Sequence, residues 1–173
     1  LFFDDSHYSK YGSKIKCNPA IKSSEDRMAI IEAVKNSKVA ALATDHAPHL
    51  ENEKKGDYLK APSGIPTVQH SLQMMLQLNS QGIISKEQIV KMMCHAPADC
   101  FRVEKRGYIR QGYYADIVIF KKEKYTVTKE NVAYKCGWSP FEGESFDYTI
   151  TDTFINGTHT VADGKLTGNI NAK

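Results

Sequence analysis

The order of apolar and polar positions divides the chain into two parts of different texture. Up to about residue 104, segments with helical spacing alternate with short apolar runs, whereas alternating strand patterns and turn signals dominate after it. Helices that alternate with strands are typical of an α/β fold, and a run of hairpin signals is typical of antiparallel sheet. We therefore expect an α/β part over residues 1–104 and a small β-rich part over residues 105–173.

Three helices and one shorter helical piece are predicted in the first part. Ser23–Asp26 supplies an N-cap with acidic residues in the first turn, and helical spacing then continues to about Asn36. Residues 66–81 repeat that spacing behind Pro66. Residues 85–93 open with a capping-box pattern, and a short helical piece is expected over residues 97–101.

Two strands are predicted in the same part of the chain. Residues 39–44 form a continuous apolar run, which suits a parallel strand covered on both faces and places Asp45 at its carboxyl end, where ligand chemistry gathers in α/β folds. A shorter strand is expected to lead into Asn18-Pro19. Residues 50–64 are polar and rich in lysine, so we expect a surface loop of the kind that forms lids or binds substrate.

The second part has the signature of an antiparallel sheet. Strands are predicted over residues 115–120 and 148–155, and Asn156-Gly157 then predicts a hairpin with its return strand over residues 158–161. Asp163-Gly164 predicts a further turn.

Composition narrows the classes of function. The chain has 173 residues, a net charge of +3 and lysines scattered among acidic residues, which argues against a nucleic-acid-binding stripe. No apolar run approaches the roughly 20 residues of a membrane span, and no secretory signal opens the chain, so a cytoplasmic location is expected. The chain begins abruptly at Leu1-Phe2-Phe3, which looks like a cut through a larger protein. The four cysteines form no CxxC pair and are expected to be thiols: Cys17, Cys94, Cys100 and Cys136.

The segment Asp45-His46-Ala47-Pro48-His49 carries three groups able to bind metal or carry protons within five residues. Pro48 prevents the regular helix that aligns histidine pairs in zincins. Two interpretations remain. Asp45 meets a metal while a histidine meets substrate, or Asp45 caps an Asx-type turn and His49 lies on the surface.

Asn18 is a second candidate, because its amide both donates and accepts hydrogen bonds and so matches an imide or ureide edge; a turn asparagine is the alternative. The remaining histidines have no organised neighbours and are assigned to the surface or to packing: His7, His70, His95 and His159.

Several motifs, taken in order, resemble the closing half of a bacterial-type dihydroorotase, a member of the amidohydrolase superfamily. They cover nearly the whole chain: Lys16–Lys22, Asp26-Arg27, Ala43–His49, Lys60–Ile65, Gly107–Phe120 and Trp138–Gly143. Ala20 and Lys22 replace the family's usual Pro and Arg, and residues 66–70 lack its common G-x-E-T. We expect these departures to affect packing or loop shape more than reaction type.

The resemblance implies a fold and an activity. Residues 1–104 would be the C-terminal part of a TIM-type (β/α)8 metal-dependent hydrolase barrel, and residues 105–173 a small β-sandwich-like composite subdomain. The activity implied is the zinc-dependent interconversion of dihydroorotate and N-carbamoyl-aspartate in de novo pyrimidine biosynthesis. In that chemistry a zinc-bound hydroxide attacks the ring amide, and a nearby carboxylate carries the proton to the leaving nitrogen.

The resemblance also assigns the site residues. Asp45 corresponds to the aspartate that binds the metal and shuttles a proton. Asn18 and His49 correspond to residues that contact the pyrimidine ring and its carboxylate, and the backbone at Ser63 and Gly64 corresponds to positions that hydrogen-bond the substrate.

The family's remaining metal ligands, an H-x-H pair, a carboxylated lysine and two histidines, are not found in this sequence. One carboxylate does not hold a catalytic metal, so the expected partner is the missing N-terminal half of the barrel. A homo-oligomer is the other partner expected. We expect the chain alone to hydrolyse nothing and to bind zinc poorly.

Two alternatives stay open. A dihydropyrimidinase or allantoinase would lack the second histidine of D-H-A-P-H, so His49 favours a substrate that bears a carboxylate. A catalytically silent, dihydroorotase-like assembly partner would have no need of Asp45, Asn18 and His49 together.

Overall fold

The computed structural model describes residues 1–168. The described chain forms two compact units: the first comprises Leu1–Lys38, Ala43–Met74 and Thr126–Ser145, and the second comprises Val39–Leu42, Met75–Tyr125 and residues 146–168. Each unit therefore draws on both sides of residue 104. The assignment of residues 1–104 to a barrel and of residues 105–173 to a separate subdomain stays a prediction.

The first unit holds short helices joined by long loops. α1 (Tyr8–Tyr11) lies between 3₁₀ turns at Asp5–His7 and Gly12–Ile15, and α2 (Ser24–Lys35) follows. Further 3₁₀ turns lie at Val68–His70 and Lys129–Asn131. The buried apolar residues of this unit include Phe3, Ile15, Ile31, Val34, Ala61, Val127, Trp138 and Phe141.

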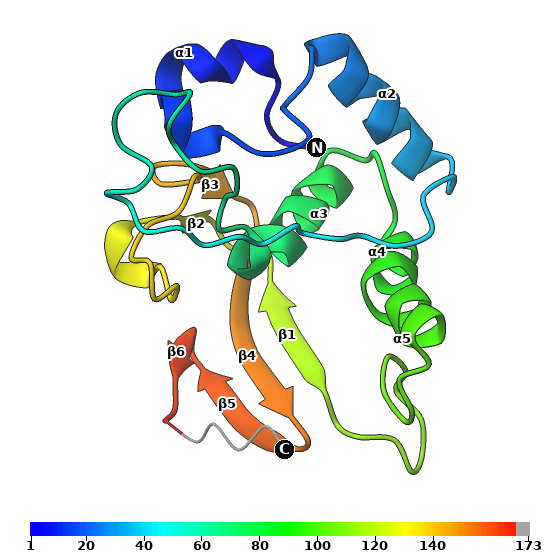
Figure 1. Cartoon of the computed structure of the whole chain (residues 1–173). Helices are drawn as coiled ribbons and strands as arrows, with labels where there is room; N and C mark the ends of the chain where they lie inside the picture. The colour runs from blue at the N-terminus through cyan, green and yellow to red at the C-terminus, as the bar shows by residue number, and fades with distance from the viewer. Residues whose placement is uncertain (169–173) are drawn as a thin grey trace. The chain divides into compact units, whose positions relative to one another are not determined.

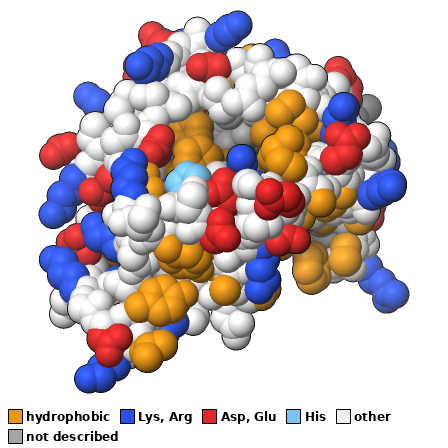
Figure 2. Space-filling view, turned by 90° about the horizontal axis from the view of Figure 1, so that it is seen from above, with side chains coloured by type: hydrophobic (Ala, Val, Ile, Leu, Met, Phe, Trp, Pro, Cys, Tyr) orange, Lys and Arg blue, Asp and Glu red, His pale blue; other side chains and the backbone are white. Residues whose placement is uncertain are grey.

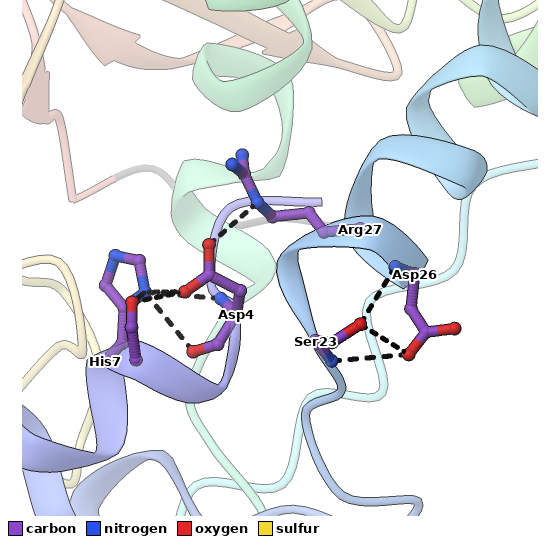
Figure 3. Close-up of polar contacts among 6 residues, drawn as sticks. Asp4, His7, Ser23, Asp26 and Arg27 are labelled. Carbon is purple, nitrogen blue, oxygen red and sulfur yellow. Dashed lines mark hydrogen bonds and ion pairs between the residues drawn. The ribbon is translucent and has the colours of Figure 1, made fainter.

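The start of α2 forms as its sequence predicts. Ser23 Oγ accepts a hydrogen bond from the Asp26 N–H (3.3 Å), and the Ser23 N–H donates to Asp26 Oδ2 (3.3 Å). Arg27, one residue further along α2, donates through Nε to Asp4 Oδ2 at 3.2 Å (Figure 3). Asp4 also contacts the His7 ring at 2.9 Å, so this carboxylate connects the N-terminal segment to α2.

Both predicted strands of the first part are wrong. Residues 39–44 are extended but form no ladder within the described residues, and they are half-buried or exposed rather than covered on both faces. The segment before Asn18 is the 3₁₀ turn Gly12–Ile15 instead of a strand. An apolar pattern shows that a segment can form a buried strand, but a strand also needs a neighbouring strand to pair with. Among the described residues, the only β-pairing of residues 39–47 is an isolated parallel bridge between His46 and Ile65.

The helices between residues 71 and 101 follow the predicted positions closely. α3 (Ser71–Ser80) contributes Met75, Leu76 and Leu78 to buried positions. α4 (Lys86–Val90) continues through a π-helical turn at Lys91–His95 into α5 (Ala96–Phe101). The two pieces expected here therefore make one helical run, and the wider turn stands just before Pro97, which has no N–H for the regular ladder.

The sheet of the second unit is antiparallel, as predicted. Its strand order is β1-β4-β5-β6, with β1 at Ile117–Lys121, β4 at Thr149–Ile155, β5 at Thr158–Ala162 and β6 at Lys165–Leu166 (Figure 1). Asn156-Gly157 and Asp163-Gly164 make the two hairpin turns, and all four residues have positive φ, between 48° and 77°. A separate two-stranded sheet joins β2 (Tyr125–Thr126) and β3 (Ser145–Phe146).

Charges of both signs are mixed on the surface. In Figure 2, lysine, arginine and acidic side chains are interspersed with apolar groups over that face. Among the described residues, no helix has the length and apolar character needed to cross a membrane.

Candidate functional site

The loop that follows residues 39–44 is held by backbone and side-chain contacts in the first unit. The Ala47 N–H donates to the Ile65 carbonyl (3.1 Å), and Thr67 Oγ1 donates to the Thr44 carbonyl (2.8 Å). His46 Nδ1 accepts from the Thr67 N–H at 3.0 Å, which leaves the proton of the neutral ring on Nε2. The segment that carries Asp45 is therefore anchored on both sides of that residue.

Asp45 itself is exposed and adopts a left-handed backbone conformation with φ of 46°. Its carboxylate accepts no hydrogen bond from the described part of the chain, so it does not cap the loop in the way an Asx turn requires. Burial raises the pKa of the Cys17 thiol, and the negative charge of Asp45 raises that pKa further. The carboxylate thus acts electrostatically on Cys17, the residue next to Asn18.

His49, Ser63 and Gly64 are brought together. The His49 Nε2–H donates to the Ser63 carbonyl at 3.0 Å, and Nδ1 lies 3.9 Å from Glu53 Oε2. Gly64 has φ of 136°, and a Cβ placed on it would lie 2.5 Å from the Ala47 Cβ and 3.0 Å from His49 Cδ2. Glycine is required at this position because the loop approaches so closely.

Lys54 joins these loops and was not anticipated from the sequence. Its side chain is completely buried, and Nζ donates to the carbonyls of Lys16 (3.0 Å), Pro62 (2.8 Å) and Gly64 (2.9 Å). The expectation of a surface loop over residues 50–64 is therefore wrong at Lys54, Ala61 and Gly64, which are buried. A lysine in a polar, lysine-rich stretch carries no sequence signal for burial.

Trp138 also helps to hold these loops, whereas the sequence motif Trp138–Gly143 predicted no contact for it. It is buried, and its indole Nε1–H donates to the His49 carbonyl at 2.9 Å. A half-open cavity of about 320 Å³ lies beside this region and is lined by His46, Pro48, Leu50, Tyr134, Lys135 and Cys136.

The candidate residues thus fall into two sets. His49, Ser63 and Gly64 are in contact, and the Gly64 N–H donates to the Lys16 carbonyl (2.9 Å), two residues from the exposed Asn18. Asp45 joins none of them by a hydrogen bond within the described residues. Of the other histidines, His70 is fully buried, and burial lowers its pKa to about 4, as expected for a packing residue.

The described residues offer few donors for a metal ion. Within residues 1–168, no group of three or more His, Cys, Asp or Glu side chains is placed to hold a metal ion. Asp45 offers one carboxylate, whereas protein metal sites use three or more ligands. The described residues alone therefore do not fit a zinc centre.

The chain belongs to the amidohydrolase family, because that family's model matches residues 8–160, most of the chain. It is 36% identical over 148 residues to a dihydroorotase of Clostridium acetobutylicum, which is 84% of this chain and 35% of that protein. It is 33% identical over 165 residues to a dihydroorotase of Halobacterium salinarum, covering 95% of this chain and 39% of that protein. The chain thus spans little more than a third of the length of these relatives.

Solved structures agree on the fold. An L-hydantoinase (dihydropyrimidinase) from Arthrobacter aurescens matches with a TM-score of 0.89 and 26% identity, over 96% of this chain and 38% of that chain. A D-hydantoinase from a Bacillus sp. AR9 matches with a TM-score of 0.86 and 26% identity, over 96% of this chain and 39% of that one. The chain therefore has the fold of the corresponding part of these amidohydrolases, which confirms the predicted family.

Proposed function

We propose that this chain is part of a dihydroorotase-type cyclic amidohydrolase, to which it contributes Asp45 as metal ligand and proton carrier. The observation that carries the proposal is the Asp45 carboxylate, which is exposed, has no hydrogen-bond partner in the described chain and stands on a strained left-handed backbone. Such strain persists where surrounding contacts hold it, and it gathers at functional sites. The carboxylate is thus available to a metal or to a water molecule.

The same proposal assigns Asn18, His49, Ser63 and Gly64 to the substrate. His49 Nε2–H already donates to the Ser63 carbonyl, so Nδ1 is the ring nitrogen left for the substrate, and it would donate to a substrate carboxylate only in the doubly protonated ring. The exposed amide of Asn18 suits the edge of a cyclic ureide. The similarity to dihydroorotases over 84% to 95% of this chain supports dihydroorotate as the substrate.

The proposal concerns the complete protein. This chain provides one metal-binding carboxylate, so the other ligands of a zinc centre would come from the part of the relatives' length that it does not span. The TIM-type barrel over residues 1–104, the β-sandwich-like subdomain over residues 105–173, the role in pyrimidine biosynthesis, the cytoplasmic location and a homo-oligomer are predictions that belong to this proposal.

A hydantoinase or dihydropyrimidinase activity is the second candidate. It is favoured by the structural match to the L-hydantoinase from Arthrobacter aurescens at a TM-score of 0.89. The two candidates differ in the substrate, because dihydroorotate carries a ring carboxylate and dihydrouracil does not. His49 and its place beside Ser63 favour the first candidate.

The test is a fusion of this chain to the preceding part of the Clostridium acetobutylicum dihydroorotase, assayed for ring opening of dihydroorotate and of dihydrouracil with zinc. We expect turnover of dihydroorotate, and a loss of at least about a thousandfold in Asp45→Asn, because both metal binding and proton transfer suffer. Asp57→Asn, an exposed acid on the neighbouring loop, is the matched control. Turnover of dihydrouracil alone would establish the second candidate, and an unaffected Asp45→Asn would refute the role of Asp45.

A further inference from the structure

The buried ammonium of Lys54 stands where the proposed substrate-binding loops meet. Three segments converge on it: its Nζ donates to the carbonyl of Lys16, two residues before Asn18, and to the carbonyls of Pro62 and Gly64, which flank Ser63. Distances of 2.8 to 3.0 Å use all three N–H groups of the ammonium. The side chain is completely buried, so water does not substitute for these partners.

The arrangement is unusual for a lysine. Burying a charged group is costly, and buried lysines are ordinarily paired with a carboxylate. Here the hydrogen-bond acceptors are three neutral carbonyl oxygens, and burial lowers the pKa of Lys54. The Lys54 ammonium is therefore held by the specific placement of these three carbonyl oxygens.

Other contacts make the same junction rigid. The Gly64 N–H donates to the Lys16 carbonyl at 2.9 Å, so this oxygen accepts from both Gly64 and Lys54. Lys16 Nζ donates to the carbonyls of Tyr58 and Leu59, which holds the far side of the loop. Ser13 Oγ donates to the Lys54 carbonyl and fixes the backbone that carries the ammonium.

We propose that Lys54 is a positioning residue of the substrate site: its ammonium holds the Asn18 and Ser63–Gly64 loops at a fixed separation beside His49. The inference rests on the proposed function for the identity of the site, but its structural content does not depend on which cyclic amide is bound. Lys54 touches no substrate and acts only through the backbone it holds.

The test compares Lys54→Met, which keeps the length and apolar stem but has no N–H, with Lys55→Met, the same change at the exposed neighbouring lysine. In the 173-residue chain, we expect hydrogen exchange of the Gly64 amide to become at least about tenfold faster in Lys54→Met, while exchange in α2 is unchanged. Lys55→Met should leave both unchanged. Equal Gly64 exchange in Lys54→Met and the unsubstituted chain would overturn the proposal.

The active fusion protein provides the functional readout. We expect KM for dihydroorotate to rise at least about tenfold in Lys54→Met with kcat within about threefold, and Lys54→Arg, which restores a buried donor cation, to recover part of the loss. A fall in thermal stability with unchanged KM would assign Lys54 a purely structural role and overturn the proposal. If the unsubstituted fusion opens no cyclic amide, the proposed function fails, and Gly64 exchange still decides the role of Lys54.

A measurement on the unsubstituted chain covers the case in which Lys54→Met does not fold. With 15N-labelled lysine, Lys54 should give a protected, slowly exchanging ammonium signal coupled to its carbonyl acceptors, distinct from the other lysines. A rapidly exchanging Lys54 ammonium would overturn the proposal.

Discussion

Gly64 shows at a single residue how closely the candidate loops approach one another. Gly64→Ala combines a φ of 136°, which L-residues rarely adopt, with a Cβ only 2.5 Å from the Ala47 Cβ. We expect the free energy of unfolding to fall by about 2 kcal/mol or more, which lowers Tm by roughly 4–8 °C, because strain and overpacking each cost about 1–3 kcal/mol. Differential scanning calorimetry measures the shift.

Gly56→Ala is the matched control for that prediction. Gly56 also has a positive φ, 99°, but a Cβ there would meet nothing within 4 Å. Its loss should therefore reflect backbone strain without a clash and be clearly smaller. Equal losses in the two variants would show that the close approach of Gly64 to Ala47 and His49 contributes nothing.

Asp4 makes stability depend on acidity. The hydrogen bond from the Ser6 hydroxyl, and after it the contacts with His7 and Arg27, lower the pKa of Asp4 in the folded chain. In the unfolded chain, the Asp4 carboxylate is protonated near the ordinary aspartate pKa of about 3.9. The contribution of Asp4 is therefore complete above that pH and is lost as the pH falls through the lower pKa of the folded state.

Urea unfolding between pH 7 and pH 2.5 tests this dependence. Asp4→Asn should flatten the loss of stability below about pH 4 relative to the unsubstituted chain. Asp5→Asn, at the exposed neighbouring acid, should not. Identical pH profiles for Asp4→Asn and the unsubstituted chain would contradict the assignment.

At the scale of elements, local signals were the reliable ones. Ser85 Oγ accepts from the Gln88 N–H (3.2 Å), and Gln88 Oε1 accepts from the Ser85 N–H (2.9 Å), which is the capping box that the sequence predicts for α4. Ser85→Ala should cost about 1 kcal/mol in urea unfolding, because the cap is lost. Ser85→Asn, which keeps an acceptor, should cost less than half of that; a Ser85→Ala chain as stable as the unsubstituted one would show that the cap does not matter.

Elements that depend on distant partners could not be predicted in the same way. Helix caps and the Asn156-Gly157 turn are determined by residues within four positions, so the sequence predicts them closely. Residues 39–44 have the apolar pattern of a buried strand, yet pairing requires a neighbour that pattern alone does not supply, and the described chain gives only the bridge from His46 to Ile65.

The same contrast between local signals and distant contacts holds for the candidate site. Asp45 and His49 stand out from the sequence because several reactive groups follow one apolar run. Lys54 and Trp138 hold the site through backbone carbonyls, and such contacts leave no trace in the choice of residue. The reactive residues of the candidate site can therefore be picked out from the sequence, whereas the residues that hold its loops cannot.

For the whole molecule, the chain spans 35% to 39% of the length of its dihydroorotase relatives, and Asp45 is the metal ligand it supplies in the proposed site. One carboxylate binds zinc weakly. We expect the isolated chain, after dialysis against zinc, to hold no more metal than its Asp45→Asn variant and to open no dihydroorotate. The fusion protein should bind zinc and open dihydroorotate, and its Asp45→Asn variant should lose both properties. Atomic absorption and a ring-opening assay measure the two quantities. Zinc-dependent turnover by the isolated chain would mean that these 173 residues assemble a complete site, in conflict with the proposal that the other ligands lie outside them.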